Sequence, residues 1–145
     1  TLRVNGAQVV GTGAAGLYTV AISQSFAASA AKYLRIIVNN NLFGALTITA
    51  TGDYSSVNAI GVFQKTYSVG INSANTSIYS AGNATTVDLG TTSDVFSMGT
   101  PSKPDATTYY VPMANLNASY TIAMALVIEM RGYIEGIVSV DIIAQ

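Results

Sequence analysis

The most chemistry-like motif in the sequence is a glycine-rich run at residues 11–16. Its spacing, G-x-G-x-x-G after an apolar pair, matches the fingerprint that brings a backbone close to a dinucleotide pyrophosphate. That site also needs a helix directly after the glycines and an acidic residue about twenty positions further on. Tyr18, Thr19 and Val20 make a poor first helical turn, and the first acidic residue, Asp53, comes too late. We therefore expect no cofactor and interpret residues 11–16 as a flexible hinge.

Three carboxylates near the end of the chain, Glu129, Glu135 and Asp141, are candidates for the paired acids of glycoside hydrolysis. On strands with alternating faces we expect them to be solvated instead. The chain has no histidine and no cysteine. This excludes Ser-His-Asp catalysis, cysteine nucleophiles, thiolate zinc sites and disulfides. We expect no catalytic residues and no metal site.

Tyrosines are the other residues with binding chemistry. Tyr109, Tyr110 and Tyr120 could stack on sugar rings, although aromatic residues are also enriched in strands for packing reasons. The chain could therefore also be a carbohydrate-binding module, or a coat or tail module of a virus.

Three N-glycosylation acceptor motifs begin at Asn75, Asn83 and Asn117. The first two fall in the most turn-like part of the chain, where a glycan could be accommodated. The only lysines are Lys32, Lys65 and Lys103. A lysine buried beside an Asn or Asp and a carboxyl group can condense into an amide crosslink, although a surface position is the simpler expectation.

The composition points to an extracellular protein rather than a cytosolic enzyme. Charged residues make up 9% of the chain against a typical value of about 25%, while hydrophobic residues make up 50%. The surface must therefore be built from Ser, Thr, Asn, Gly and Tyr. A formal net charge of −1 gives no sign of a nucleic-acid partner or an anionic membrane.

Residues 120–143 form the most apolar and most regular stretch. From Thr121 to Arg131 large apolar side chains alternate with small or charged ones, which is the two-residue period of a strand with one buried face. The pattern resumes after Gly132. We predict two adjacent strands in a hairpin that turns near Arg131-Gly132. The stretch is too short between charges for a membrane span, which needs about twenty apolar residues.

Shorter strands are predicted at residues 17–23, 33–39, 45–51, 61–67 and 109–113. Residues 26–32 are rich in alanine and could form one or two helical turns, and residues 70–104 look loop-rich. Short strands separated by turns predict an all-β chain, folded as a single β-sandwich or a partly open barrel of the pilin or immunoglobulin-like kind. At 145 residues the chain is long enough for one such domain.

The order of these parts resembles the donor-strand pilus subunits, and among them the thread filament subunits of thermoacidophilic archaea. The resemblance lies in the layout: an N-terminal segment at residues 1–10, a Gly-rich hinge at 11–16 and a β-body at 17–145, with three acceptor motifs and no cysteine. It implies a secreted, N-glycosylated structural protein that forms an extracellular filament by head-to-tail strand donation, with adhesion or biofilm roles.

The resemblance also assigns roles to residues. Leu2, Val4 and Val9 or Val10 would fill a groove of the neighbouring subunit, as side chains of a donor strand do. An intersubunit amide crosslink would pair Asn5 with a lysine of the neighbour. The expected partners are further copies of the chain and N-linked glycans.

Overall fold

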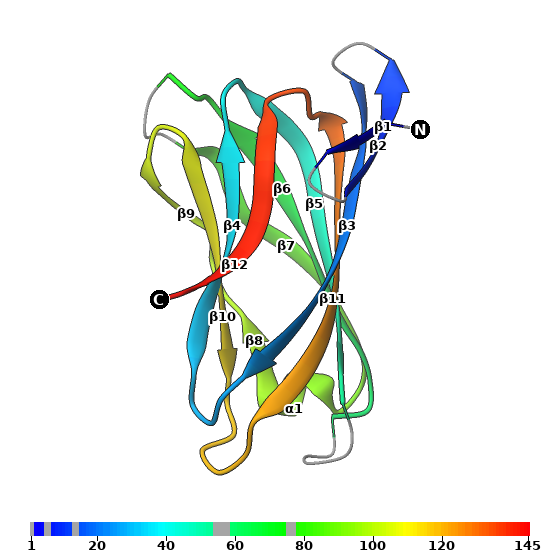
Figure 1. Cartoon of the computed structure of the whole chain (residues 1–145), viewed down its shortest axis with the longest axis vertical. Coiled ribbons are helices and arrows are strands. Elements are labelled where there is room, and N and C mark those ends of the chain that lie inside the picture. Colours follow the sequence, from blue (N-terminus) through cyan, green and yellow to red (C-terminus); the bar gives the residue numbers. More distant parts are fainter. Residues whose placement is uncertain (1, 5–6, 13–14, 54–58, 75–77) are drawn as a thin grey trace.

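The computed structural model describes residues 2–4, 7–12, 15–53, 59–74 and 78–145, and in these ranges the chain is almost entirely β-structure (Figure 1). One short helix, α1 (Thr92–Val95), accompanies twelve strands. The strands are β1 (Leu2–Val4), β2 (Ala7–Thr12), β3 (Ala15–Phe26), β4 (Ala31–Val38), β5 (Leu42–Gly52), β6 (Gly61–Ile71), β7 (Ile78–Gly90), β8 (Phe96–Met98), β9 (Ser102–Asp105), β10 (Thr108–Asn115), β11 (Ile122–Tyr133) and β12 (Ile137–Ala144).

The strands form two antiparallel sheets. The large sheet has seven strands in the order β1-β2-β3-β11-β5-β6-β7, and the small sheet has the order β12-β4-β10-β8, with β9 also paired to β10. Figure 1 shows the two sheets as the layers of a sandwich. The predicted all-β sandwich is therefore confirmed, and the described strands do not close into a barrel.

The central strand β11 supplies much of the core. Its even-numbered side chains from Ile122 to Met130 are at most 2% exposed, whereas Ala123, Ala125 and Val127 face outward. The predicted alternation is thus confirmed. Burial of each such large side chain contributes roughly 1.5–3 kcal/mol, so this face accounts for a large part of the folding free energy. Leu34, Ile36, Val38, Tyr109, Val111 and Met113 of the small sheet are buried in the same core cluster.

The predicted hairpin between the last two strands is wrong. Strand β11 continues through Gly132, and β12 lies in the other sheet, paired with β4. Gly132 has φ +129° and is paired with Gly44, and a Cβ on Gly132 would lie 2.3 Å from the Phe43 carbonyl oxygen. The glycine therefore permits a close approach inside a strand and does not mark a turn. The chain turns instead at residues 134–136, where the Ile137 amide donates to the Ile134 carbonyl.

Two other local predictions are wrong. Residues 27–30 form a tight turn between β3 and β4, so the predicted helical turns are absent there. Much of the stretch expected to be loops is the 13-residue strand β7, which pairs along β6. Its Asn and Gly residues suggested turns, but pairing with a neighbouring strand overrides such weak local preferences.

Asn115 fixes one end of the sandwich. Its side chain is 2% exposed, and its Nδ2 donates to the carbonyls of Phe26 (3.1 Å), Ala27 (3.1 Å) and Tyr120 (2.8 Å). Its Oδ1 accepts from the Asn117 amide at 2.8 Å. One buried amide thus ties the end of β3 to the loop between β10 and β11 through hydrogen bonds to three backbone carbonyls.

Two core tyrosines differ in one hydrogen bond, and this gives a matched prediction. The Tyr67 hydroxyl donates to the Gly99 carbonyl at 2.9 Å, whereas the buried Tyr109 hydroxyl has no partner among the described residues. We expect Tyr67→Phe to lower the free energy of unfolding by about 1 kcal/mol and Tyr109→Phe to raise it by about 1 kcal/mol. Urea denaturation of the two variants measures both changes. A loss of stability in Tyr109→Phe equal to that in Tyr67→Phe would contradict the assignment.

The same two tyrosines make the stability of the fold depend on pH in alkaline solution. Burial raises the pKa of Tyr67 to about 12. The pKa of Tyr109 is also raised, mainly by burial and to a smaller extent by the charge of the neighbouring Tyr67. In the unfolded chain both phenols ionise near pH 10. As the pH rises, the phenols therefore ionise in the unfolded state at a lower pH than in the folded state. The free energy of unfolding is unaffected by this below pH 10 and decreases as the pH rises above 10. The variant with both phenylalanines should lose less stability over that range.

Candidate assembly site

The N-terminal segment is placed in the chain's own large sheet. Strand β1 pairs with β2 in the register Leu2↔Val9 and Val4↔Ala7, and β2 pairs with β3 from Gln8↔Thr19 to Thr12↔Ala15. This differs from the predicted free donor strand. The reason lies in the sequence, since Asn5-Gly6 is a strong signal for a two-residue hairpin connection. Residues 5 and 6 and the side chains of Leu2, Val4, Val9 and Val10 lie outside the described part of the structure.

The ends of the predicted hinge at residues 11–16 lie in strands, and its centre, Gly13-Ala14, lies outside the described residues, so the hinge stays a prediction. Gly11 and Thr12 end β2, and Ala15 and Gly16 begin β3, so the strands run into the glycine-rich run from both sides. Because β3 continues as a strand to Phe26, no helix follows the glycines. The run therefore lacks the helix N-terminus that would hold a pyrophosphate.

The β1–β2 hairpin extends beyond the small sheet. Its strand β2 pairs with the first residues of β3. Strand β12 of the small sheet also contacts β3. Figure 1 shows the hairpin (dark blue) projecting to one side, clear of β12 (red). The described hairpin backbone thus lies in the large sheet, at its β3 edge.

The same flank has two strand edges without a described neighbouring strand, at residues 20–26 and 139–144, and we call them the open seam. Strand β12 pairs with β4 on one side, and along residues 139–144 no described strand pairs with its other side. Strand β3 pairs with β2 only at residues 15–19, which leaves residues 20–26 without a described partner on that side. Between these edges Val20 and Ile22 of β3, and Ile137 and Ile142 of β12, pack on the core but are only partly buried. An added strand would complete both the hydrogen bonding and the burial here.

Strand β12 has little of the protection that edge strands usually carry. It contains no lysine and no proline, and its register shifts once, between Ile137 and Ser139. Its one charged residue, Asp141, faces outward and is held by a bidentate ion pair with Arg35, at 2.6 Å from Nη2 to Oδ2 and 2.9 Å from Nε to Oδ1. Natural edges without such protection pair readily with another strand.

The acceptor asparagines lie apart from one another. Asn75 is outside the described residues, and Asn83 lies within strand β7 and not in a loop as expected, with its side chain undescribed. Asn117 lies in the turn after β10, and its Oδ1 accepts from the amides of Ser119 and Tyr120, both at 2.9 Å. Modification of these three sites stays a prediction.

Two of the three lysines are engaged within the chain. The Lys65 ammonium donates to the Met98 carbonyl at 2.8 Å. Lys103 is 8% exposed and donates to the carbonyls of Asp105 and Ala106; burial lowers its pKa, and Asp105 partly opposes this. Lys32 is half-buried near the start of β4. A crosslink involving Asn5 is not addressed by the described residues and stays a prediction.

The predicted carboxylates and tyrosines do not form one site. Glu129 lies on the outer face of the large sheet and Asp141 on the outer face of the small sheet, with the sandwich between them, and Glu135 lies in the turn at residues 134–136. Such a separation exceeds the roughly 5–9.5 Å of a glycosidase pair, because the sheets alone are about 10 Å apart. Tyr109 is a core residue, Tyr110 stacks on Tyr33 with centroids 4.3 Å apart, and Tyr120 is an exposed loop residue.

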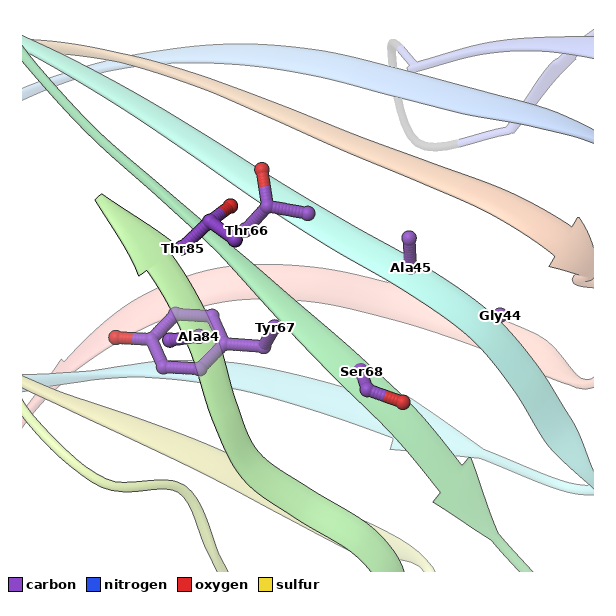
Figure 2. A pocket seen from close by; sticks show the side chains of 7 residues that line it. All are labelled: Gly44, Ala45, Thr66, Tyr67, Ser68, Ala84 and Thr85. Carbon is purple, nitrogen blue, oxygen red and sulfur yellow. The ribbon is translucent and has the colours of Figure 1, made fainter. Parts of the chain in front are cut away.

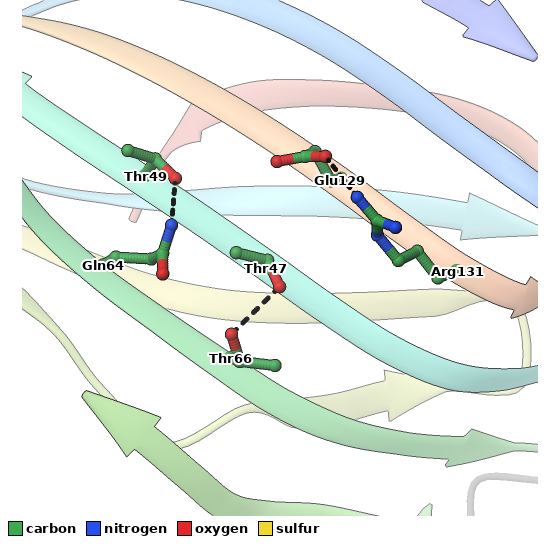
Figure 3. A network of polar contacts seen from close by, with 6 residues as sticks. All are labelled: Thr47, Thr49, Gln64, Thr66, Glu129 and Arg131. Carbon is green, nitrogen blue, oxygen red and sulfur yellow. Dashed lines mark hydrogen bonds and ion pairs between the residues drawn. The ribbon is translucent and has the colours of Figure 1, made fainter. Parts of the chain in front are cut away.

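The outer face of the large sheet carries two cross-strand hydrogen bonds between β5 and β6 and one ion pair within β11 (Figure 3). Thr47 and Thr66 join their hydroxyls at 2.9 Å, Gln64 donates to Thr49 at 2.9 Å, and Arg131 contacts Glu129 at 3.2 Å. A shallow depression of about 520 Å³ lies beside them and is lined by Gly44, Ala45, Thr66, Tyr67, Ser68, Ala84 and Thr85 (Figure 2). Its one ionisable group, Tyr67, is buried, so the depression offers no general acid or base.

The described residues contain no group of side chains suited to hold a metal ion. Within the same residues, no helix has the length and apolar character needed to cross a membrane.

No protein-family profile and no curated protein sequence matches the chain. Among solved structures the chain is similar to the tailspike protein gp49 of the Acinetobacter baumannii bacteriophage Fri1, a capsular polysaccharide depolymerase, with a TM-score of 0.42 and 15% identity. The match covers 96% of this chain and 21% of that one, so the chain spans about a fifth of the tailspike. A likeness at this level carries no argument about function.

Proposed function

We propose that the protein is a structural subunit that assembles head to tail, with the N-terminal hairpin segment of one copy adding to the open seam of the next. The observation that supports this most is the open seam itself: residues 20–26 of β3 and 139–144 of β12 have no described neighbouring strand on one side and lie over half-buried apolar side chains. In its extracellular setting the polymer would be a filament of the donor-strand type, with glycans on its surface.

The chain carries both halves of such a contact. In the polymer β2 would leave its pairing with β1 and β3 of the same chain, and its six residues are compatible in length with the eight of β12. The N-terminal residues would supply Leu2, Val4, Val9 and Val10 to a seam whose described half-buried side chains are valine and isoleucine. A contact between two different patches is heterologous, and it extends into an open fibre unless its rotation closes a ring.

A viral coat or tail module is the second candidate, and it differs in the assembly it predicts. A monomer or a closed oligomer of fixed size would favour such a module, whereas strand donation gives polymers whose length grows with concentration. Electron microscopy of the purified protein over a tenfold concentration range separates the two.

A charge placed in the seam tests the interface. Ala144 lies at the exposed end of β12, on the face that includes buried Val140 and half-buried Ile142. Ala144→Lys would place an ammonium where the added strand docks, and burial of an unpaired charge opposes docking. We expect the critical concentration for polymerisation to rise at least about tenfold, which corresponds to about 1.4 kcal/mol.

The matched control is Ala123→Lys, which adds the same side chain at an exposed position on the outer face of β11. It should leave the critical concentration unchanged, and both variants should keep the wild-type melting temperature. An equal effect of the two substitutions, or none from either, would remove the seam from the interface.

A further inference from the structure

The end of the sandwich that carries the turn at residues 134–136 has a second depression, separate from the open seam. It has a volume of about 350 Å³ and is lined by Asn40, Asn41, Phe43, Tyr133 and Glu135. Tyr133 is 60% exposed and Phe43 38% exposed, which makes them two of the few large aromatic side chains that the described surface presents to solvent. The depression combines exposed rings with amide and carboxylate groups.

The depression has a rigid base. Phe43 and Tyr133 are directly paired on β5 and β11, one residue beyond the paired glycines Gly44 and Gly132. The turn at residues 39–41 packs on the turn at 134–136, where the Asn39 amide donates to the Gly136 carbonyl at 2.8 Å. A Cβ on Gly136 would lie 2.7 Å from the Asn40 carbonyl, so the two turns touch through backbone.

One polar side chain of the depression, Asn40, is oriented by a hydrogen bond, and another, Glu135, is available to a ligand. The Asn41 amide donates to Asn40 Oδ1 at 2.8 Å, which orients the Asn40 side chain with its Nδ2 turned away from that bond. Glu135 is exposed and forms no hydrogen bond or ion pair with the described residues. A carboxylate accepts hydrogen bonds only, and an amide both donates and accepts, so the set suits vicinal hydroxyl groups.

We infer that this depression, which is separate from the proposed assembly site, binds a neutral saccharide, one hexose ring at a time. The apolar face of a pyranose would lie against Tyr133 and Phe43, and its hydroxyls would bond to Glu135 and the two asparagines. The volume is near the lower limit for small-ligand sites, roughly 300 Å³. The lining contains no cation, and the Glu135 charge disfavours uronic acids and phosphates.

The experiment is a titration of the ¹⁵N-labelled protein with the methyl glycosides of glucose, galactose and mannose, followed by NMR. At least one glycoside should shift the amide signals of Asn40 and Asn41 with a Kd in the millimolar range, as expected for a shallow site on one ring. The methyl glycoside of glucuronic acid should bind more weakly, and Glu135→Gln should abolish that difference.

Tyr133→Ala should weaken glycoside binding at least about tenfold. The matched control is Tyr120→Ala, because Tyr120 is 55% exposed and contributes only backbone hydrogen bonds elsewhere in the fold. The inference is overturned if no glycoside shifts Asn40 or Asn41, or if both alanine variants bind as the wild type does. Assembly can fail in the seam variants without any change in these shifts, so the two proposals are tested separately.

Discussion

A chain that lacks residues 1–12 is expected to remain a folded monomer under conditions in which the full chain polymerises. Every residue of the described core lies at or after Tyr18, and residues 2–12 pair at the edge of the large sheet, so the truncated chain should keep that core. It also removes the only segment proposed to fill the seam. The expected change is complete loss of polymer, measured by light scattering and electron microscopy, with little change in the far-ultraviolet circular dichroism.

A peptide of residues 1–12 provides the control. Added to the truncated chain, it should bind and raise the melting temperature, because a ligand that binds only the folded state stabilises it by mass action. A scrambled peptide of the same composition should not. Polymers of normal length from the truncated chain would show that the N-terminal segment is not the donor.

Asn115→Asp is expected to be the most destabilising single substitution that we propose. The Nδ2 group that serves the carbonyls of Phe26, Ala27 and Tyr120 would become a carboxylate oxygen facing those same carbonyls. The site is 2% exposed, so the charge would be buried without a donor. We expect a loss of about 3–5 kcal/mol at pH 7, as for other buried charges left unpaired, measured by urea denaturation.

The pH dependence of this variant has a defined sign. Burial and the three carbonyls would raise the pKa of Asp at position 115 above the unfolded value of about 3.9. The folded state would then bind the proton more tightly, so the penalty is largest above the folded pKa and shrinks as the pH falls towards 3.9. The variant should therefore approach wild-type stability in acid.

Asn117→Asp is the matched control, two residues away. The Asn117 Oδ1 accepts from the amides of Ser119 and Tyr120, and a carboxylate accepts the same two bonds. We expect a change within about 0.5 kcal/mol, measured on protein made in a host without N-glycosylation. Equal destabilisation by the two substitutions would contradict the role given to the Asn115 amide.

The sequence predicts the fold class and the core well, because the two-residue period of residues 121–131 depends only on which face is buried. The inward face of β11, including Leu126 and Ile128, lies where the pattern places it. Periodicity does not specify strand partners, however. The last two strands are neighbours in sequence but belong to different sheets. Gly132 is a site of close backbone approach within a strand, and in sequence such a glycine looks the same as one that marks a turn.

The candidate sites are less accessible to sequence reasoning. The open seam arises because β2 covers only part of β3 while β12 lies at a sheet edge, and both facts depend on strand order. The aromatic depression joins residues about ninety positions apart through the pairing of Phe43 with Tyr133. Neither residue stands out in sequence, whereas the tyrosines that did, such as Tyr109, serve the core.

The absence of cysteine allows a direct test of head-to-tail strand addition. Gln8→Cys places a single thiol on the hairpin, and Ala144→Cys places one at the seam. After mixing and mild oxidation, strand donation predicts a disulfide-linked dimer that contains one copy of each variant, with few dimers from either variant alone, because the contact joins two different patches. Polymers that form without this mixed dimer, or that yield homodimers equally well, would contradict the account.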